Sequence, residues 1–435
     1  MPLIMKIVNH RQREYIFKDH SMSGNTFSKR LALLVCAAVV ALPTVVMAQA
    51  GSLDPTFGTN GIVTTANTVA NAAVLQSDGK IVVAGSIANS QNFQQGGLLR
   101  YTSNGVLDSS FGTGGKVLIA VGTSEADAAF ATAIQTDGKI VAAAPDSVRL
   151  TVFRFNSNGT ADNSFGTNGS ETITAAGFLF SPVSGGIALQ SDGKIVVVTG
   201  DIVARLLANG QLDSTFGSGG VAPTVGGNSV AILSNGQILI GSGNVTSLYT
   251  ANGSLVTRFG VNGQTAGFPF DGIGGFVVTT DPTTNLIKIV TAGSLITSPN
   301  LTFAQNTSGF LLVRYTSNGT IDNSFGTHGG VATPFPGNLF SQAFAVAAQT
   351  NGDIVAVGQT ALTDVNAIPG PSNFGLARYL PNGQIDTTFG NGGFVSTAFG
   401  SSEAFANTVL IQTDGKIVAA GNSNSGTTVA RYLGN

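Results

Sequence analysis

Short apolar runs alternate with glycine-containing turns throughout residues 51–435. In the first unit four runs predict β-strands: GIVTT at 61–65, NAAVLQ at 71–76, KIVVAG at 80–85 and GLLRYT at 97–102. Asp-Gly and Asn-Gly pairs between such runs tolerate positive φ, so they predict tight hairpin turns. KIVVAG is apolar almost throughout, which predicts a strand buried on both faces. The pattern therefore indicates an all-β fold of short antiparallel strands.

This unit recurs along the chain with a period of about 55 residues. A Phe-Gly pair marks each copy, at Phe57, Phe111, Phe165, Phe216, Phe259, Phe325 and Phe389. A run like QSDGKIVVAG and a strand ending in Arg-aromatic follow each pair, in degraded form in the weaker copies. Seven such units fill the region, which predicts a seven-bladed β-propeller of four-stranded antiparallel blades. An open β-solenoid is the alternative.

The motifs LDSSFGTGGKV, QSDGKIVVAG and RYTSNG, which recur in this order, resemble the delta-60 repeat family of bacterial exported proteins. The resemblance covers essentially all of residues 51–435. It implies a β-propeller domain of unknown function and carries no catalytic residues over to this chain. The unit around Phe259 departs most, because it lacks both the Asp and the Asp-Gly-Lys turn.

An Asp precedes the marker Phe by three residues in six units, and in five of them it follows a strand Arg by eight residues. The odd unit has Leu248 in place of the Arg and Val256 in place of the Asp. This unit has lost both charges together, which predicts that the Arg and the Asp form a direct ion pair in the other units. Removal of one partner alone would leave a buried charge without its counter-charge. The pairs are Arg100–Asp108, Arg154–Asp162, Arg205–Asp213, Arg314–Asp322 and Arg378–Asp386.

Two residues of this pattern have no partner in their own unit. Arg431 has no Asp after it, and Asp54 has no Arg before it. We predict that they pair with each other and close the ring. The segment LDPTFGTNG near the N-terminus then completes the unit that begins with TVARYLGN at the C-terminus.

The same Asp could instead bind calcium, but one Asp per turn falls short of the six to eight oxygens that Ca²⁺ requires. Catalysis by six equivalent carboxylates is also disfavoured, because a ring of like sites does not build one asymmetric active site. A structural role is therefore preferred, with the Phe as a core anchor. We expect no cofactor.

The N-terminal fifty residues have the order of a secretory signal: Lys29-Arg30, then an apolar run, then small-residue sites ending at Ala48 or Ala50. An uncleaved anchor helix is the alternative, since about 18 apolar residues can span a bilayer. The polar stretch 1–21 is long for a signal peptide, so we expect translation to start at Met22. The domains are therefore residues 1–50, a removable leader, and 51–435, one propeller.

Removal of the leader leaves no cysteine and His328 as the one histidine, which excludes a Cys/His nucleophile and gives no support for a zinc site. Net charge of residues 51–435 is near −6, which argues against a nucleic-acid partner. His328 occupies a turn position held by Asn or Gly in sister units, so an inert exposed side chain is expected. Glu125 and Glu403 lie at matching points and are interpreted as solvated turn acids.

Three loops between the third strand and the Arg strand depart from the repeat: SIANSQNFQQGG, SLITSPNLTFAQNTSG and QTALTDVNAIPGPSNFG. They occupy the same place in their units and should share one face. Variable polar loops on a regular scaffold favour recognition, with neutral drift as the alternative. The candidate binding residues are Asn92, Phe93, Gln94, Asn300, Phe303, Gln305, Asn366 and Asn373.

Two classes of function remain open. The first is an exported, non-enzymatic propeller that binds a polar ligand, a glycan or a protein. The second is a propeller enzyme, a glycan hydrolase or lyase, with two carboxylates about 5–10 Å apart in the axial funnel. We expect a secreted or periplasmic monomer with no membrane attachment after signal cleavage.

Overall fold

The computed structural model describes residues 49–89, 93–119, 128–145, 149–174, 185–265, 272–281, 284–295, 309–337, 340–362, 371–400 and 403–434. The chain divides into two units, Met1–Met47 and Ala48–Asn435, and the described residues all belong to the second. The predicted leader, with Cys36, lies outside the described residues.

In the described part of the chain the regular elements are all β-strands, and they pair antiparallel in six sheets. The first two sheets are β2 (Thr68–Leu75), β3 (Ile81–Ala88), β4 (Gln94–Tyr101) and β5 (Lys116–Ile119), then β6 (Ala131–Ile134), β7 (Ile140–Pro145), β8 (Leu150–Phe155) and β9 (Ser170–Ile173). The third contains β10 (Gly186–Leu189), β11 (Ile195–Leu206), β12 (Val221–Ile232), β13 (Ile238–Ser242) and β14 (Val245–Tyr249).

The remaining three sheets each have four strands. They are β15 (Gly272–Thr280), β16 (Ile287–Leu295), β17 (Gly309–Thr316) and β18 (Gly330–Thr333); then β19 (Phe340–Ala348), β20 (Ile354–Ala361), β21 (Ser372–Tyr379) and β22 (Phe394–Thr397); and finally β23 (Ala404–Ile411), β24 (Ile417–Ser423) and β25 (Gly426–Tyr432) with β1 (Ile62–Thr65). The N-terminal strand β1 thus pairs with β25 at the other end of the sequence.

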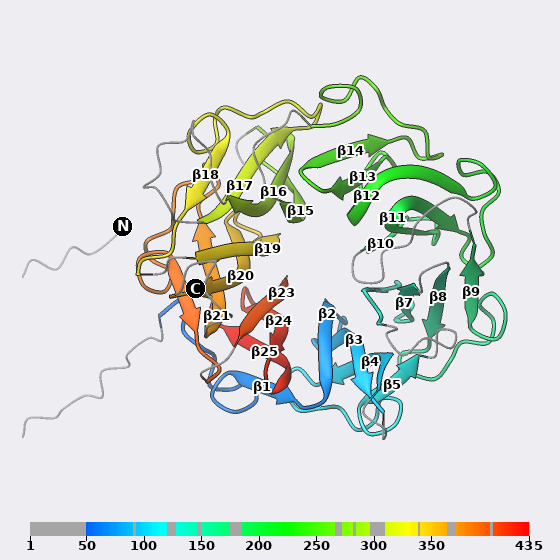
Figure 1. The fold of residues 1–435 in the computed structure, drawn as a ribbon, viewed down its shortest axis with the longest axis horizontal. Coiled ribbons are helices and arrows are strands. Elements are labelled where there is room, and N and C mark those ends of the chain that lie inside the picture. The colour runs from blue at the N-terminus through cyan, green and yellow to red at the C-terminus, as the bar shows by residue number, and fades with distance from the viewer. Residues whose placement is uncertain are drawn as a thin grey trace, which may run out of the picture. The chain divides into compact units, whose positions relative to one another are not determined.

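The sheets follow one another in a ring (Figure 1). In five of the six sheets the first strand contacts its counterpart in the next: β2 contacts β6, β6 contacts β10, β15 contacts β19, β19 contacts β23, and β23 contacts β2. The strand β12 contacts β15 and so links the third sheet to the fourth. These contacts make the fold an all-β propeller.

The prediction of seven separate blades is wrong, because the strands form six sheets, one of them with five strands. The third and fourth sequence repeats share that sheet. The strand β11 runs without a break through Gly200, and β12 runs through Gly227. Only five positions separate Gly200 from Arg205, so the third strand of this repeat and its Arg strand join into the single strand β11 without a loop between them. The pairing of β12 with β11 and β13 shifts register at Gly200/Ile202 and Gly227/Ser229, where these long strands are irregular.

The core consists of apolar layers between neighbouring sheets. On β3, Val82 and Ala84 pack with Ile140 of the next sheet, whereas Ile81 and Val83 belong to the layer shared with the sheet before it. Seven of the eight residues of β3 are buried. The prediction that this strand is buried on both faces is therefore confirmed.

Candidate functional site

The recurring Arg and Asp form a compact cluster where one sheet meets the next, which we call the joint. At the first internal joint, Arg100 Nε donates to Asp108 Oδ2 at 2.9 Å, and Asp108 Oδ1 accepts bonds from the Ser110 hydroxyl at 2.6 Å and backbone N–H at 3.1 Å. Arg100 Nη1 donates to the backbone carbonyl of Ser157, in the turn that follows β8 of the next sheet. The guanidinium lies over the Phe111 ring, 4.5 Å from its centre. The joint therefore ties each Arg strand both to its own turn and to the neighbouring sheet.

The same geometry recurs at every Arg–Asp joint. The Nε to Oδ2 distances are 2.7 to 2.9 Å for Arg154–Asp162, Arg205–Asp213, Arg314–Asp322, Arg378–Asp386 and Arg431–Asp54. In each case the Arg lies 4.6 to 4.8 Å from the centre of the following Phe ring. Every residue that the sequence assigned to an ion pair is therefore in contact with its assigned partner.

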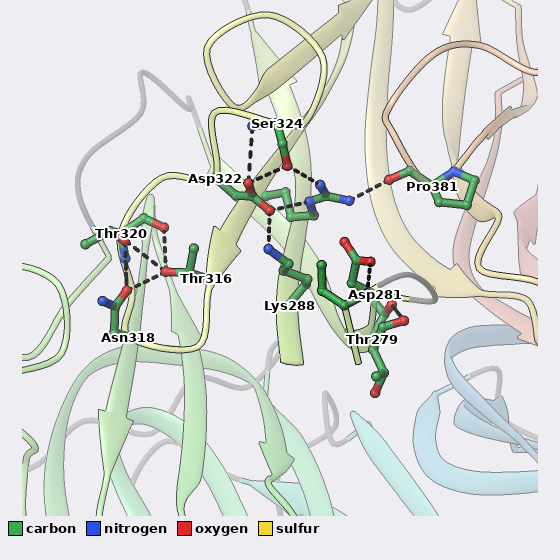
Figure 2. A network of polar contacts seen from close by, with 12 residues as sticks. Thr279, Asp281, Lys288, Thr316, Asn318, Thr320, Asp322, Ser324 and Pro381 are labelled. Carbon is green, nitrogen blue, oxygen red and sulfur yellow. Dashed lines mark hydrogen bonds and ion pairs between the residues drawn. The ribbon is translucent and has the colours of Figure 1, made fainter. Parts of the chain in front are cut away.

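Figure 2 shows the joint around Asp322. Lys288 Nζ donates to Asp322 Oδ2 at 2.7 Å, and the Ser324 hydroxyl donates to Oδ1 at 2.7 Å. The Arg314 guanidinium donates to the carbonyl of Pro381, in the turn that follows β21 of the next sheet. A lysine from the turn after the first strand likewise approaches the joint carboxylate at Lys80–Asp108, Lys139–Asp162 and Lys416–Asp54. The carboxylate thus accepts bonds on both oxygens and faces two cations.

These contacts hold the joint carboxylates in the charged form. Burial alone would raise the pKa of Asp54, but the bonds from Thr56 and Lys416 and the charge of Arg431 outweigh it and lower the pKa to about 2. The same balance lowers the pKa of Asp322 to about 2, with Lys288 and Ser324 as donors. The pKa values of Asp108, Asp162, Asp213 and Asp386 are also lowered against the effect of burial. A general acid needs a raised pKa, so these carboxylates are unsuited to that role.

The odd joint is apolar. Leu248 is buried and belongs to one cluster with Phe259, against which Val256 packs. The backbone bonds of the joint are kept: Val256 N–H donates to the Leu248 carbonyl at 2.8 Å, as Asp108 N–H does to Arg100. Arg258 takes the place of the usual Ser or Thr and is exposed. An apolar pair can therefore replace the ion pair in the same backbone frame.

A second contact between sheets was missed by the sequence analysis. The buried Tyr101 hydroxyl lies 2.7 Å from the hydroxyl of Thr65, the last residue of β1 in the preceding sheet. Tyr432 donates in the same way to Thr397, the last residue of β22, at 2.8 Å. Burial raises the pKa of Tyr101 to about 12 despite the bond to Thr65, and it raises that of Tyr432 as well.

Two sheets have an apolar version of this contact. Phe155 replaces the Tyr and shares a cluster with Ile119, the last residue of β5. Leu206 stands at the Tyr position in the next sheet and shares a cluster with Ile173, the last residue of β9. In these two sheets both partners of the contact have changed together from polar to apolar residues. The same kind of paired replacement marks the Arg–Asp contact in the sequence.

A third contact joins the innermost strands. Five of them carry a register shift at the same place, between residues 70/72, 227/229, 273/275, 343/345 and 406/408. The extra residue is Asn71, Asn228 or Asn407 in three, and its side-chain amide donates to a backbone carbonyl of the next sheet at 2.8 to 3.2 Å. These bulges therefore serve packing between sheets.

Of the predicted binding-loop residues, Asn92, Asn300, Phe303, Gln305 and Asn366 lie outside the described residues. Gln94 accepts a bond from the Ser86 hydroxyl at 2.8 Å, and Asn373 donates to the Ser396 hydroxyl at 3.0 Å. Phe93 is exposed. The described strand ends beside these loops lie at the ends of the sheets opposite the joints, because strand directions alternate.

The single titratable residues that the sequence analysis named, His328 and Glu403, are both exposed. His328 is exposed and has a φ of 52°, a left-handed turn conformation that Asn168 and Asn262 also adopt at matching positions. Glu403 is exposed at the start of its sheet, and Glu125 lies outside the described residues. Within the described ranges, no three His, Cys, Asp or Glu side chains gather as a metal site. No described helix is long and apolar enough to span a membrane.

A cavity of about 630 Å³ opens at the joint-side ends of β6, β10 and β12, between three successive turns. Thr136, Ser191 and Ser234 contribute hydroxyls, and Leu189 contributes an apolar side chain. Asp192 is the one carboxylate among its described lining residues, and Lys194 binds its Oδ2 at 2.6 Å. This hydrogen bond lowers the pKa of Asp192. A second hollow of about 490 Å³ borders the cavity and contains Asp137, which lies 3.5 Å from Lys139.

Among solved structures, similar folds include the extracellular domain of a hybrid two-component system from B. thetaiotaomicron, at 14% identity and a TM-score of 0.47 over 88% of this chain and 40% of that chain. A protein of unknown function from Bacteroides caccae is 15% identical, with a TM-score of 0.37 over 58% of this chain and 79% of that chain. The chain thus spans 40% of the length of the first structure. No curated protein matches the sequence.

A family model described as a domain of unknown function (DUF5122) beta-propeller matches residues 76–111, 135–165, 190–216, 288–325 and 349–389. Each matched segment begins near an Asp-Gly or Asn-Gly turn and ends at or near a joint Phe, apart from the fourth, which begins at Lys288. The motifs that carry the match are therefore those that build the contacts between sheets. On this evidence five segments of the chain are similar to a β-propeller family of unknown function.

Proposed function

We propose that the protein is an exported, non-enzymatic β-propeller that binds a neutral, hydroxyl-rich ligand of the glycan class, and that its repeats are of the delta-60 type. The observation that carries this proposal is the lining of the 630 Å³ cavity, which combines hydroxyl and amide groups with apolar side chains and has one charged residue, Asp192, paired with Lys194. A volume of this size is within the range of small-ligand sites. Hydroxyl and amide groups beside an apolar surface suit a sugar better than an anion.

The pairing of the carboxylates with lysine and arginine supports glycan binding over glycan hydrolysis. A glycan hydrolase needs two carboxylates, one of them protonated at neutral pH. In the two described hollows, Asp192 and Asp137 are each bound by the lysine two residues later. The joint carboxylates are bound by arginine and have lowered pKa values. None of these groups has the surroundings of a general acid.

Export is proposed from the sequence of the leader. Residues 51–435 lack cysteine, so burial and hydrogen bonds would have to stabilise the fold outside the cell without disulfides. The three contacts between sheets are suited to that requirement, because each recurs around the ring.

The test is a binding screen of the purified chain from Gln49 on a glycan array and a peptide library, with and without Ca²⁺. Ser191→Trp fills the cavity, and Ser77→Trp is the matched control, because Ser77 is exposed at the same turn position of the first repeat. We expect a glycan to be bound without turnover, and Ser191→Trp alone to weaken binding at least tenfold. Release of cleaved glycan, or loss of binding in Phe93→Ala with Ser191→Trp unaffected, would contradict the proposal.

A further inference from the structure

One turn of the ring is built from both ends of the chain. At an internal joint a continuous turn leads from the Arg strand to the Asp, with Gly105 N–H bonded to the Thr102 carbonyl at 2.9 Å. At the last joint Gly51 N–H donates to the Leu433 carbonyl at 2.7 Å, and Leu433 N–H donates to Ser52 at 2.8 Å. Leu433 therefore takes the place of Thr102, and Gly51 takes that of Gly105. The segments around Gly51 and Leu433 therefore meet inside this turn.

Ala50 supplies a bond that every other joint has. At each of six Phe-Gly pairs the Gly N–H donates to the carbonyl of an Asn in the next turn, as Gly58 does to Asn104 at 2.7 Å. In the remaining pair Gly390 N–H donates to the carbonyl of Ala50, also at 2.7 Å. Ala50 thus replaces the turn Asn at the place where the chain is interrupted.

The residues on either side of Ala50 also take part in this turn. Gly51 has a φ of 86°, close to the 84° of Gly105, and a Cβ there would lie 2.7 Å from Gly390 N. The Gln49 carbonyl accepts a bond from Ser52 N–H at 3.0 Å, and the Gln49 side-chain amide donates to the Gly390 carbonyl. Residues 49 and 50 are therefore part of the folded joint.

We propose that the leader is cleaved between Ala48 and Gln49, so that the mature protein begins at Gln49. The inference rests on the proposed export. Signal cleavage favours small residues at the first and third positions before the cut. That rule alone favours a cut after Ala50, because Ala48-Gln49-Ala50 has alanine at both positions, whereas Val46-Met47-Ala48 has valine at one. A cut after Ala50 would remove the acceptor of Gly390 N–H and both contacts of Gln49.

Intact-mass spectrometry of the exported protein, expressed as the full chain in a bacterial host, tests the proposal. We expect a mass that starts at Gln49, or at its cyclised form, which is lighter by one ammonia. A start at Gly51 would overturn the inference and leave export intact. A chain that keeps its leader would overturn both.

A matched pair of variants separates the two sites in the full chain. Ala50→Leu changes the first position before the alternative cut and no required position of the proposed one, and it keeps the backbone carbonyl, so it should be processed like the unaltered protein; a block of processing in Ala50→Leu would overturn the proposal. Ala48→Leu changes a required position of both cuts and is the control that should abolish processing. Purified chains starting at Gln49 should unfold about 1–3 °C higher than chains starting at Gly51, and equal midpoints would contradict the role given to Ala50.

Discussion

Breaking the last joint should destabilise the protein strongly, and removing both partners should cost less than the two single changes together. Arg431→Leu removes the 2.9 Å bond to Asp54, the bond to Thr56 at 3.0 Å and the bond to the Ser103 carbonyl. It leaves the carboxylate of Asp54, which is 2% exposed, with only the Thr56 bonds and Lys416 at 3.2 Å. Stranding one member of a buried ion pair costs about 3–5 kcal/mol.

We expect the lower end of that range, about 3 kcal/mol, because Lys416 remains beside the carboxylate. Asp54→Val should cost a similar amount, since Arg431 is itself buried. The double variant reproduces the apolar pairing of Leu248 and Val256, so it should lose about 3–4 kcal/mol rather than about 6. The expected coupling energy is therefore about 2–3 kcal/mol.

Urea unfolding followed by far-ultraviolet circular dichroism measures these free energies in a chain that has no tryptophan. Lys416→Met is the control, because its side chain is 28% exposed and such pairs contribute about 1 kcal/mol or less. Additive losses, with a coupling energy below about 0.5 kcal/mol, would refute the claim that the two residues act as one buried pair.

The remaining predictions concern pH and the other contacts between sheets. The joint aspartates have pKa values below those of the unfolded chain, so their contribution is fully present above about pH 4. It is lost as pH falls from about 4 through about 2, so the urea midpoint should change little between pH 7 and pH 5 and fall between pH 4 and pH 2. Tyr432→Phe removes the bond to Thr397 and should cost about 1–3 kcal/mol in urea unfolding; a loss below about 0.3 kcal/mol would argue against that bond. Asn407→Ala removes the bond to the Ala70 carbonyl and should lower the thermal midpoint by about 1–3 °C, and an unchanged midpoint would contradict the role of the bulge.

Much of the joint could be predicted from the sequence because its members keep a fixed spacing. Arg100 and Asp108 are eight residues apart, and the substitution of both at Leu248 and Val256 shows that they vary together. The pairing of Arg431 with Asp54 follows from the same spacing once the chain is treated as a ring. Its 2.9 Å contact agrees with that reasoning.

The Tyr–Thr contact is harder to predict from the sequence than the Arg–Asp contact. Thr65 and Tyr101 belong to different sheets, and the intervening loops vary in length from one repeat to the next. The number of sheets does not follow from the number of repeats. The motifs define seven repeats, whereas a sheet is defined by hydrogen bonding, which continues through Gly200 and Gly227. The cavity lies between the turns of three repeats, and no single motif encodes its lining.

The recurring Arg–Asp motif builds a structural joint between sheets, and the segment around Asp54 completes the last joint. Hydrogen–deuterium exchange of the mature chain, read by mass spectrometry on peptides covering 49–61 and 102–115, tests it most directly. Both peptides should be protected to a similar degree, because the N–H groups of Gly51, Asp54 and Gly61 are hydrogen-bonded as their internal counterparts are. Complete exchange of 49–61 within seconds, with 102–115 protected, would contradict it.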